Sequence, residues 1–174
     1  MNTNTILLNQ TRIKSIIFDL IALSVITLTP ALSHLFSIPF YLLEPMRIML
    51  LISLFHTSKK NAFILSFVLP FFSLIISSHP SFPKAVLIST ELMLNVYLFF
   101  LLLQKINNSF TAMFLSIVLS KFYYYAIKFL LVSLGLMTGE IVSTPIYLQV
   151  LVAVALSFYA FFVMRKEKNK GLSI

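Results

Sequence analysis

Six apolar stretches follow one another through almost the whole chain, and only short polar breaks separate them. Each is close to the roughly 20 residues that cross a hydrocarbon core of about 30 Å as a helix. They are Lys14–Phe36, Pro39–His56, Asn61–Ser77, Lys84–Gln104, Phe110–Leu136 and Thr144–Met164. We therefore expect an all-α integral membrane protein, one domain over residues 1–174, built as a six-transmembrane-helix bundle with short loops.

The composition supports a chain dissolved in lipid. Of the 174 residues, 59% are hydrophobic and 10% are charged, and the mean hydropathy is +0.99. Soluble domains carry about 25% charged residues, and a soluble fold of this size has too little interior to hide so much apolar surface.

The basic residues indicate an orientation rather than a nucleic-acid partner. The formal net charge is +8, but the cations lie mainly at segment ends and form no basic stripe with interleaved aromatic residues. With the amino terminus inside, Lys84 is the only basic residue among the outer loops. The cytoplasmic side then holds Arg12, Lys14, Lys59, Lys60, Lys105, Arg165, Lys166, Lys168 and Lys170. This bias predicts that both termini are cytoplasmic.

Polar side chains inside the spans are the residues that lipid would exclude. They are Asp19, Glu44, Arg47, Glu91, Asn95, Lys121, Lys128 and Gln149. A charged side chain costs at least about 2.5–3.5 kcal/mol at a helix centre, so each is expected to face protein or a water-filled cavity.

Several of these residues fall at one depth. Arg47, Glu91 and Lys128 lie roughly 10–12 Å below the outer ends of their spans, at 1.5 Å per residue. The same outer half also contains Glu44, His34 and Gln149. Residues three or four apart share a helix face, which applies to Glu44 with Arg47 and to Glu91 with Asn95. Lys121, Tyr124 and Lys128 form a stripe on one face for the same reason. We expect an outward-facing pocket for an organic ligand that carries a carboxylate or several hydrogen-bonding groups.

Structural readings stay open beside this one. Glu91 could simply pair with Lys128 or Arg47 and hold the bundle together. Lys121, nearer mid-membrane, and Asp19, near the inner face, are expected to be structural or to face a partner.

The aromatic and histidine positions are similarly ambiguous. His34 and His79 lie near span ends, where a histidine either contacts a ligand or is merely solvated. The run Tyr123–Tyr125 either packs or lines the pocket.

Catalytic chemistry is not expected. The chain has no Cys and three Gly, Asp19 is its only Asp, and motifs for nucleophiles, zinc or phosphate loops are missing. We expect no enzyme activity, cofactor or metal, and any nucleotide hydrolysis must come from another polypeptide. An unrecognised intramembrane enzyme would need a nucleophile and a base at a common depth.

Short motifs in the first half resemble a known family. The stretches LTPALSHLF, beginning at Leu28, and LEPMRIMLLISLFHTSKKNAF, beginning at Leu43, resemble the first two helices of substrate-binding S components of energy-coupling factor (ECF) transporters. One branch of this family has a Pro and a His ending the first helix, then a Pro-Met-His turn. The matching residues are Pro30, His34, Pro45 and Met46, with Arg47 in place of the histidine.

The resemblance extends roughly from Ile21 to Leu130. Pro70 matches a Pro-containing third helix, and Leu119-Ser120-Lys121 occupies the place of a Leu-Gly-Arg step. The Pro-rich loop and the Glu-Leu pair of the fourth helix correspond to Pro80, Pro83, Glu91 and Leu92.

The resemblance implies a function and partners. An S component is a six-helix bundle in the prokaryotic plasma membrane that captures a vitamin or similar micronutrient from outside. It docks on a transmembrane coupling subunit driven by two ABC-type ATPase subunits. The permanent cation of Arg47, where the branch has a titratable ring, is expected to favour an anionic ligand.

Roles follow for the pocket residues. Arg47 and Lys128 are expected to contact an anion, and Glu91 and Asn95 to hydrogen-bond to the ligand or to those cations. The Pro80–Pro83 loop is expected to act as a lid, with Tyr124, Tyr125 and Gln149 in the wall. The alternative is a non-transporting scaffold of the MreD cell-shape type, in which the charges pair internally and leave no outer-half cavity.

The expected orientation can be tested with single cysteines, because the chain has none of its own. On intact cells, a membrane-impermeant maleimide should label Ser143→Cys in an outer break. It should label Lys105→Cys in an inner break only after permeabilisation. The reverse pattern would place the termini outside.

Overall fold

The helices of this chain begin at residues suited to the start of a helix. The computed structural model describes residues 3–78 and 80–169, with side chains over residues 12–78 and 80–166. Ser58 caps α3 by accepting a hydrogen bond from the Asn61 N–H at 3.2 Å, and Asn108 caps α5 by accepting one from the Phe110 N–H at 3.0 Å. Proline occupies the first turn of α2 and of α4, where its missing N–H costs nothing.

Within the described residues the fold is all helical, as the sequence predicts. The elements are α1 (Thr3–Phe36), the 3-10 helix η1 (Phe40–Leu43), α2 (Pro45–His56), α3 (Lys59–Ser77), α4 (Phe82–Lys105), α5 (Ser109–Ser133) and α6 (Ile146–Asn169). In the described part, five helices are long and apolar enough to cross a membrane. They are α1, α3, α4, α5 and α6.

The second expected span differs from the observed structure. Residues Pro39–His56 were expected to form one continuous helix, but η1 ends at Leu43 and α2 begins only at Pro45. Between them Glu44 has φ 54° and ψ 56°, a left-handed conformation. A residue before proline is disfavoured in the right-handed helical region, so the chain breaks here. The remaining 12 residues of α2 rise about 18 Å, which is short of the hydrocarbon thickness.

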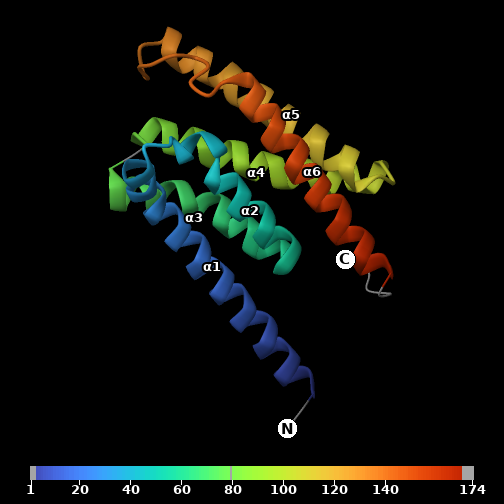
Figure 1. Ribbon diagram of the computed structural model, residues 1–174. Coiled ribbons are helices and arrows are strands. Elements are labelled where there is room, and N and C mark those ends of the chain that lie inside the picture. Colours follow the sequence, from blue (N-terminus) through green and yellow to red (C-terminus); the bar gives the residue numbers. More distant parts are fainter. Residues whose placement is uncertain (1–2, 79, 170–174) are drawn as a thin grey trace.

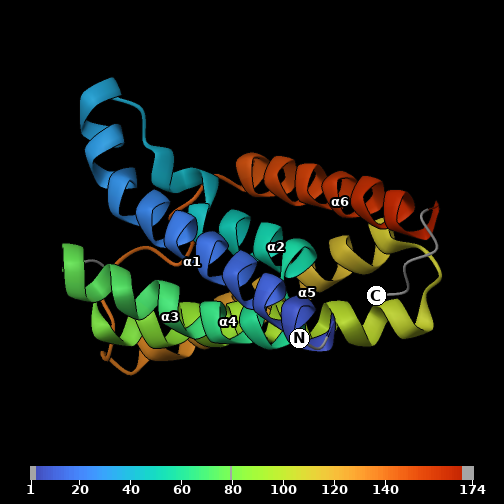
Figure 2. The ribbon, with the colours of Figure 1, turned by 90° about the horizontal axis from the view of Figure 1, so that it is seen from below.

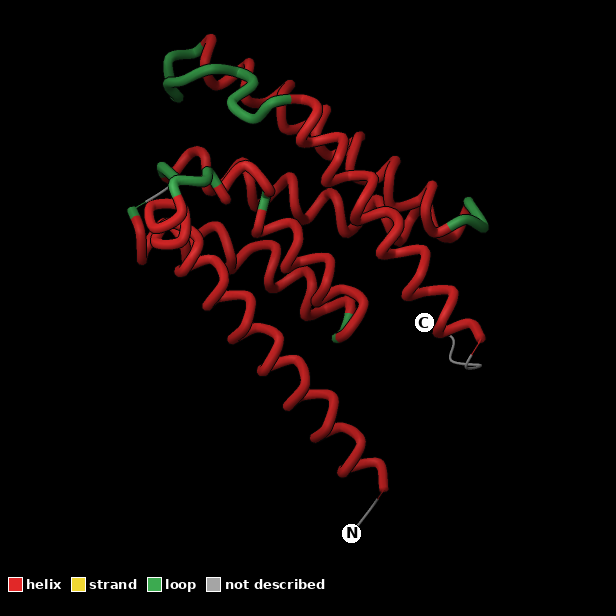
Figure 3. The backbone as a smooth tube through the Cα atoms, viewed as in Figure 1, coloured by secondary structure: helices red, strands yellow, loops and turns green. Residues whose placement is uncertain are grey.

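The helices form a bundle in which α4 is central to one half. Helix α4 packs against α3 and α5, α6 packs against α5, and α1 and α2 pack against each other and against α3. Figures 1 and 2 show this arrangement from two directions. Figure 3 shows that the connections at residues 37–44, 80–81 and 134–145 lie at one end of the bundle. The start of α1 and the end of α6 lie toward the opposite end (Figure 1).

Small side chains lie where the helices meet. Ala22 in α1, Ala62 in α3, Ala112 in α5 and Ala160 in α6 are completely buried in the main core. Small residues let helix backbones approach closely, which is how helices associate in lipid. Large apolar side chains such as Phe122 and Ile75 are instead about three-quarters exposed, at 75% and 76%. The outer surface therefore suits contact with lipid.

Asp19 has a structural partner inside the bundle. The Asn61 amide donates a hydrogen bond to the Asp19 carboxylate at 2.6 Å and joins α1 to the start of α3. The same amide lies 3.4 Å from the hydroxyls of Ser53 and Thr57. A polar cluster thus ties three helices together, at the end of the bundle away from the 37–44 connection.

The close helix contacts predict that Ala160→Leu destabilises the protein by about 1–3 kcal/mol, because the added atoms overpack a filled site. Val150→Leu is a control on the same helix, where the side chain is 50% exposed, and should change stability by less than about 0.5 kcal/mol. Denaturant unfolding in mild detergent, followed by circular dichroism, compares the two. Equal effects would show that α6 is not packed at Ala160.

Candidate ligand-binding cavity

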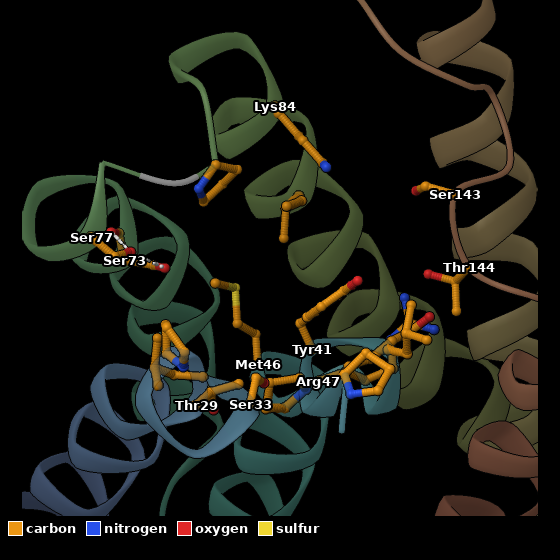
Figure 4. A pocket seen from close by; sticks show the side chains of 18 of the residues that line it. Thr29, Ser33, Tyr41, Met46, Arg47, Ser73, Ser77, Lys84, Ser143 and Thr144 are labelled. Atoms are coloured by element: carbon orange, nitrogen blue, oxygen red, sulfur yellow. Dashed lines mark hydrogen bonds and ion pairs between the residues drawn. The ribbon is translucent and has the colours of Figure 1, made fainter. Parts of the chain in front are cut away.

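A cavity of about 720 Å³ lies at the end of the bundle that carries the 37–44 connection. Its walls come from the end of α1, the 37–44 segment, the starts of α2 and α4, the end of α3, the middle of α5 and the segment before α6. Figure 4 shows Met46, Tyr41 and Lys84 projecting around this space. Much of the lining is apolar, including Ile26, Pro30, Ile38, Leu42, Ile88 and Leu92.

Four charged side chains form one ion-pair network at the wall of this cavity. Arg47 binds Glu91 through its Nη2 atom, and its Nε atom lies 3.3 Å from Glu44 Oε2. The Lys121 ammonium lies 2.5 Å from Glu44 Oε1 and 3.5 Å from Glu91 Oε1. Each cation therefore contacts both carboxylates, and the four formal charges cancel.

The break before α2 places two members of this network. Pro45 starts α2, so Arg47 is in its first turn, and the left-handed Glu44 precedes it. The spacing of three residues then brings the Glu44 carboxylate to the Arg47 side chain. Glu91 reaches the same point from α4, and Lys121 from α5.

Burial makes the pairing necessary. Arg47 is 2% exposed and Glu91 is 3% exposed. Taking an ion out of water costs several kcal/mol unless a partner of opposite charge and good hydrogen bonds compensate it. Two cations facing two anions meet this requirement without any ligand.

Six of the sequence-predicted site residues line the cavity. They are His34, Glu44, Arg47, Glu91, Tyr124 and Tyr125. Pro80, from the expected lid loop, lines it as well.

Asn95 does not reach the cavity. It is fully buried one turn beyond Glu91, and its amide donates a hydrogen bond to the Ser116 hydroxyl at 3.0 Å. This bond crosses between α4 and α5, so Asn95 contributes to helix packing rather than to the wall.

Gln149 lies outside the cavity lining and contacts residues of the wall. Its amide donates a hydrogen bond to the Thr144 carbonyl at 2.7 Å, and it also hydrogen-bonds Tyr125. Thr144 and Tyr125 line the cavity, so Gln149 holds two parts of the wall in place.

Lys128 and His79 complete the predicted set. Lys128 is 3% exposed and lies outside the cavity lining, with its ammonium 5.7 Å from the ring centre of Tyr124. His79 lies outside the described residues.

Lys121 was expected from the sequence to be structural or to face a partner, and its place in the cavity wall was missed. The signal was present, because Lys121 shares the stripe of Tyr124 and Lys128, and two buried acids require two nearby cations. The other polar lining residues that were not singled out are Thr29, Ser33, Ser37, Tyr41, Ser73, Ser77, Lys84, Ser143 and Thr144.

No protein-family model, curated protein or solved structure matches this chain. Among the described residues, no group of three His, Cys, Asp or Glu side chains could hold a metal ion.

The network predicts a characteristic pattern of stabilities. Arg47→Met should lower the free energy of unfolding by about 3–5 kcal/mol, because it leaves Glu91 buried beside a single cation. The double variant Arg47→Met/Glu91→Leu should recover most of this loss, since Glu44 and Lys121 still pair. Denaturant unfolding measures the unmodified protein, Arg47→Met, Glu91→Leu and the double variant.

Lys105→Met, which removes an exposed cation, is the matched control and should change the free energy of unfolding by less than about 0.5 kcal/mol. If the double variant lost as much as the sum of the two single variants, Arg47 and Glu91 would not be coupled.

Proposed function

We propose that this chain is a membrane subunit that captures a small molecule from outside the cell. The cavity carries this proposal. Its volume of about 720 Å³ falls within the roughly 300–1,000 Å³ of sites for small organic ligands. Apolar walls with a few convergent polar groups are also typical of such sites.

The location of the cavity fits capture from outside. It lies at the end that holds the connections at residues 37–44, 80–81 and 134–145 (Figure 3). The distribution of Lys and Arg along the sequence favours that end as the outer one. A ligand would then enter between loops rather than through lipid.

The finer proposal is an S component of an ECF-type importer, a multi-pass protein of the prokaryotic plasma membrane with six transmembrane segments and cytoplasmic termini. The motif resemblance supports it, and so does the place of its residues. Pro30, His34, Met46 and Glu91, which carry part of the resemblance, all line the cavity. The subunit would bind a vitamin or related micronutrient and dock on a coupling subunit with two ABC ATPases.

A non-transporting scaffold is the second candidate, because one observation favours it. The intramembrane charges Arg47, Lys121, Glu44 and Glu91 pair with one another, as a scaffold requires. A scaffold, however, has no need of the cavity that these charges border, so ligand capture accounts for more of the structure.

Co-purification tests the capture function. Protein purified without added ligand should carry a small molecule that mass spectrometry identifies. Met46→Trp should reduce the bound amount by about tenfold or more, because the larger side chain takes up part of the cavity and leaves all four charges paired. Lys105→Met, at an exposed position outside the lining, is the control and should retain the molecule.

Two outcomes separate the general proposal from the finer one. A ligand that binds the unmodified chain but not Met46→Trp, without co-purification of a coupling subunit or ATPase pair from the native host, would support capture and contradict the ECF assignment. If no molecule binds and the protein still assembles with other membrane proteins, the scaffold explains the chain better.

A further inference from the structure

The charges around the cavity do not balance once the ion-pair network is complete. Arg47 and Lys121 are neutralised by Glu44 and Glu91. Two further cations lie at the same end of the bundle. Lys84 lines the cavity from the first turn of α4. Lys128 lies one α5 turn beyond Tyr124, which also lines it.

Lys128 is a buried lysine that makes no direct contact with a carboxylate. Within the described residues it makes no hydrogen bond or ion pair, although it is only 3% exposed. Its ammonium contacts the face of the Tyr124 ring, and it interacts electrostatically with Lys84 and Lys121, both of like charge, and with Glu140. Lysine side chains this buried are usually paired with an anion, because desolvation of the charge without a partner is costly.

Lipid does not account for this position. A lysine near a helix end can extend its ammonium to the headgroups, but such a side chain is exposed. The neighbours Phe129 and Leu130 are 55% and 53% exposed and form the outer face of α5. Lys128 points the other way, into the protein.

The Tyr124 ring links the cations to the cavity. The Lys121 ammonium lies 5.5 Å from the ring centre and the Lys128 ammonium 5.7 Å from it. Tyr124 itself is 7% exposed and forms part of the wall. The Lys128 ammonium therefore lies next to a ring of the cavity wall, and Lys84 lines the same cavity. The four-carbon side chain of Lys128 is flexible.

We propose that the cavity takes an amphipathic organic anion, whose carboxylate or phosphate is held between Lys84 and Lys128. The apolar part of the ligand lies against Ile26, Ile88 and Leu92. Arg47, expected from the sequence to contact the anion, remains with its two glutamates instead. This inference rests on the proposed capture function and names the class of its ligand.

A first experiment compares two lysines of one helix in protein freed of bound molecules by extensive washing. Lys128→Met should raise the midpoint of thermal unfolding by about 3 °C or more, because it removes an unpaired buried charge. Lys121→Met should lower the midpoint, because it leaves Glu44 and Glu91 with one cation. A decrease in both variants would overturn the proposal, since Lys128 would then have a stabilising partner without any ligand.

A second experiment tests the ligand class with defined probes. Benzoate, phenylacetate, hexanoate and monophenyl phosphate are each added to the unmodified protein, and the three carboxylates are compared with their primary amides. At least one anion should raise the unfolding midpoint, and the amide of an active carboxylate should not. Lys128→Met and Lys84→Gln should each weaken the response by about tenfold or more.

The outcomes distinguish this inference from the function on which it rests. If the co-purified molecule is neutral or cationic, or if amides act as well as acids, capture stands and the anion site fails. If no probe acts and no molecule co-purifies, both fail. The probes are tested in uncharged detergent with and without phosphatidylglycerol, and a response to that lipid alone would assign the site to a headgroup and overturn the proposal.

Discussion

The pairing of Arg47 with Glu91 is the interaction on which the arrangement of this end of the bundle depends. A guanidinium that is 2% exposed cannot remain charged in an apolar interior unless carboxylates surround it. Because Glu91 comes from α4 and Arg47 from α2, the pair fixes the start of α2 against α4 across a distance of 44 residues in sequence. Lys121, which belongs to α5, contacts the carboxylates of both Glu44 and Glu91 and so holds α5 in the same cluster. Three helices are thereby held around a space that their apolar side chains leave unfilled.

Charged side chains that already pair with one another beside a cavity are harder for a ligand to bind than free charges are. A ligand that competed for Arg47 or Glu91 would have to separate ions already in contact, and it would leave one of them buried and unpaired. Binding is less costly at cations that lie outside this network, which in this fold are Lys84 and Lys128.

Helix positions could be predicted from the sequence because hydropathy reports burial in lipid over long segments. The break at Glu44 could not be seen in hydropathy, since Leu43, Pro45 and Met46 are as apolar as a helix interior. It depends on a backbone angle, and only the restriction that Pro45 places on the residue before it indicates the break.

The depths of Arg47 and Glu91 correctly suggested that they lie together. Depth alone could not decide their partners, because long side chains carry their charges away from their own Cα positions. Asn95 shares a helix face with Glu91, but Ser116 on α5 takes up its amide, and that contact exists only once the helices have packed.

Glu44 belongs both to the 37–44 segment, which lines the cavity, and to the ion-pair network that sets the charge of the cavity wall. The residue ends the 37–44 segment, stands in the left-handed conformation before α2, and contributes its carboxylate to Arg47 and Lys121. Any displacement of this segment that carries Glu44 away also removes a negative charge from the wall. The electrostatic potential inside the cavity would then become more positive. Displacement of Glu44 would strengthen the attraction for anions, and its return would complete the ion-pair network again, so that access and selectivity depend on one side chain.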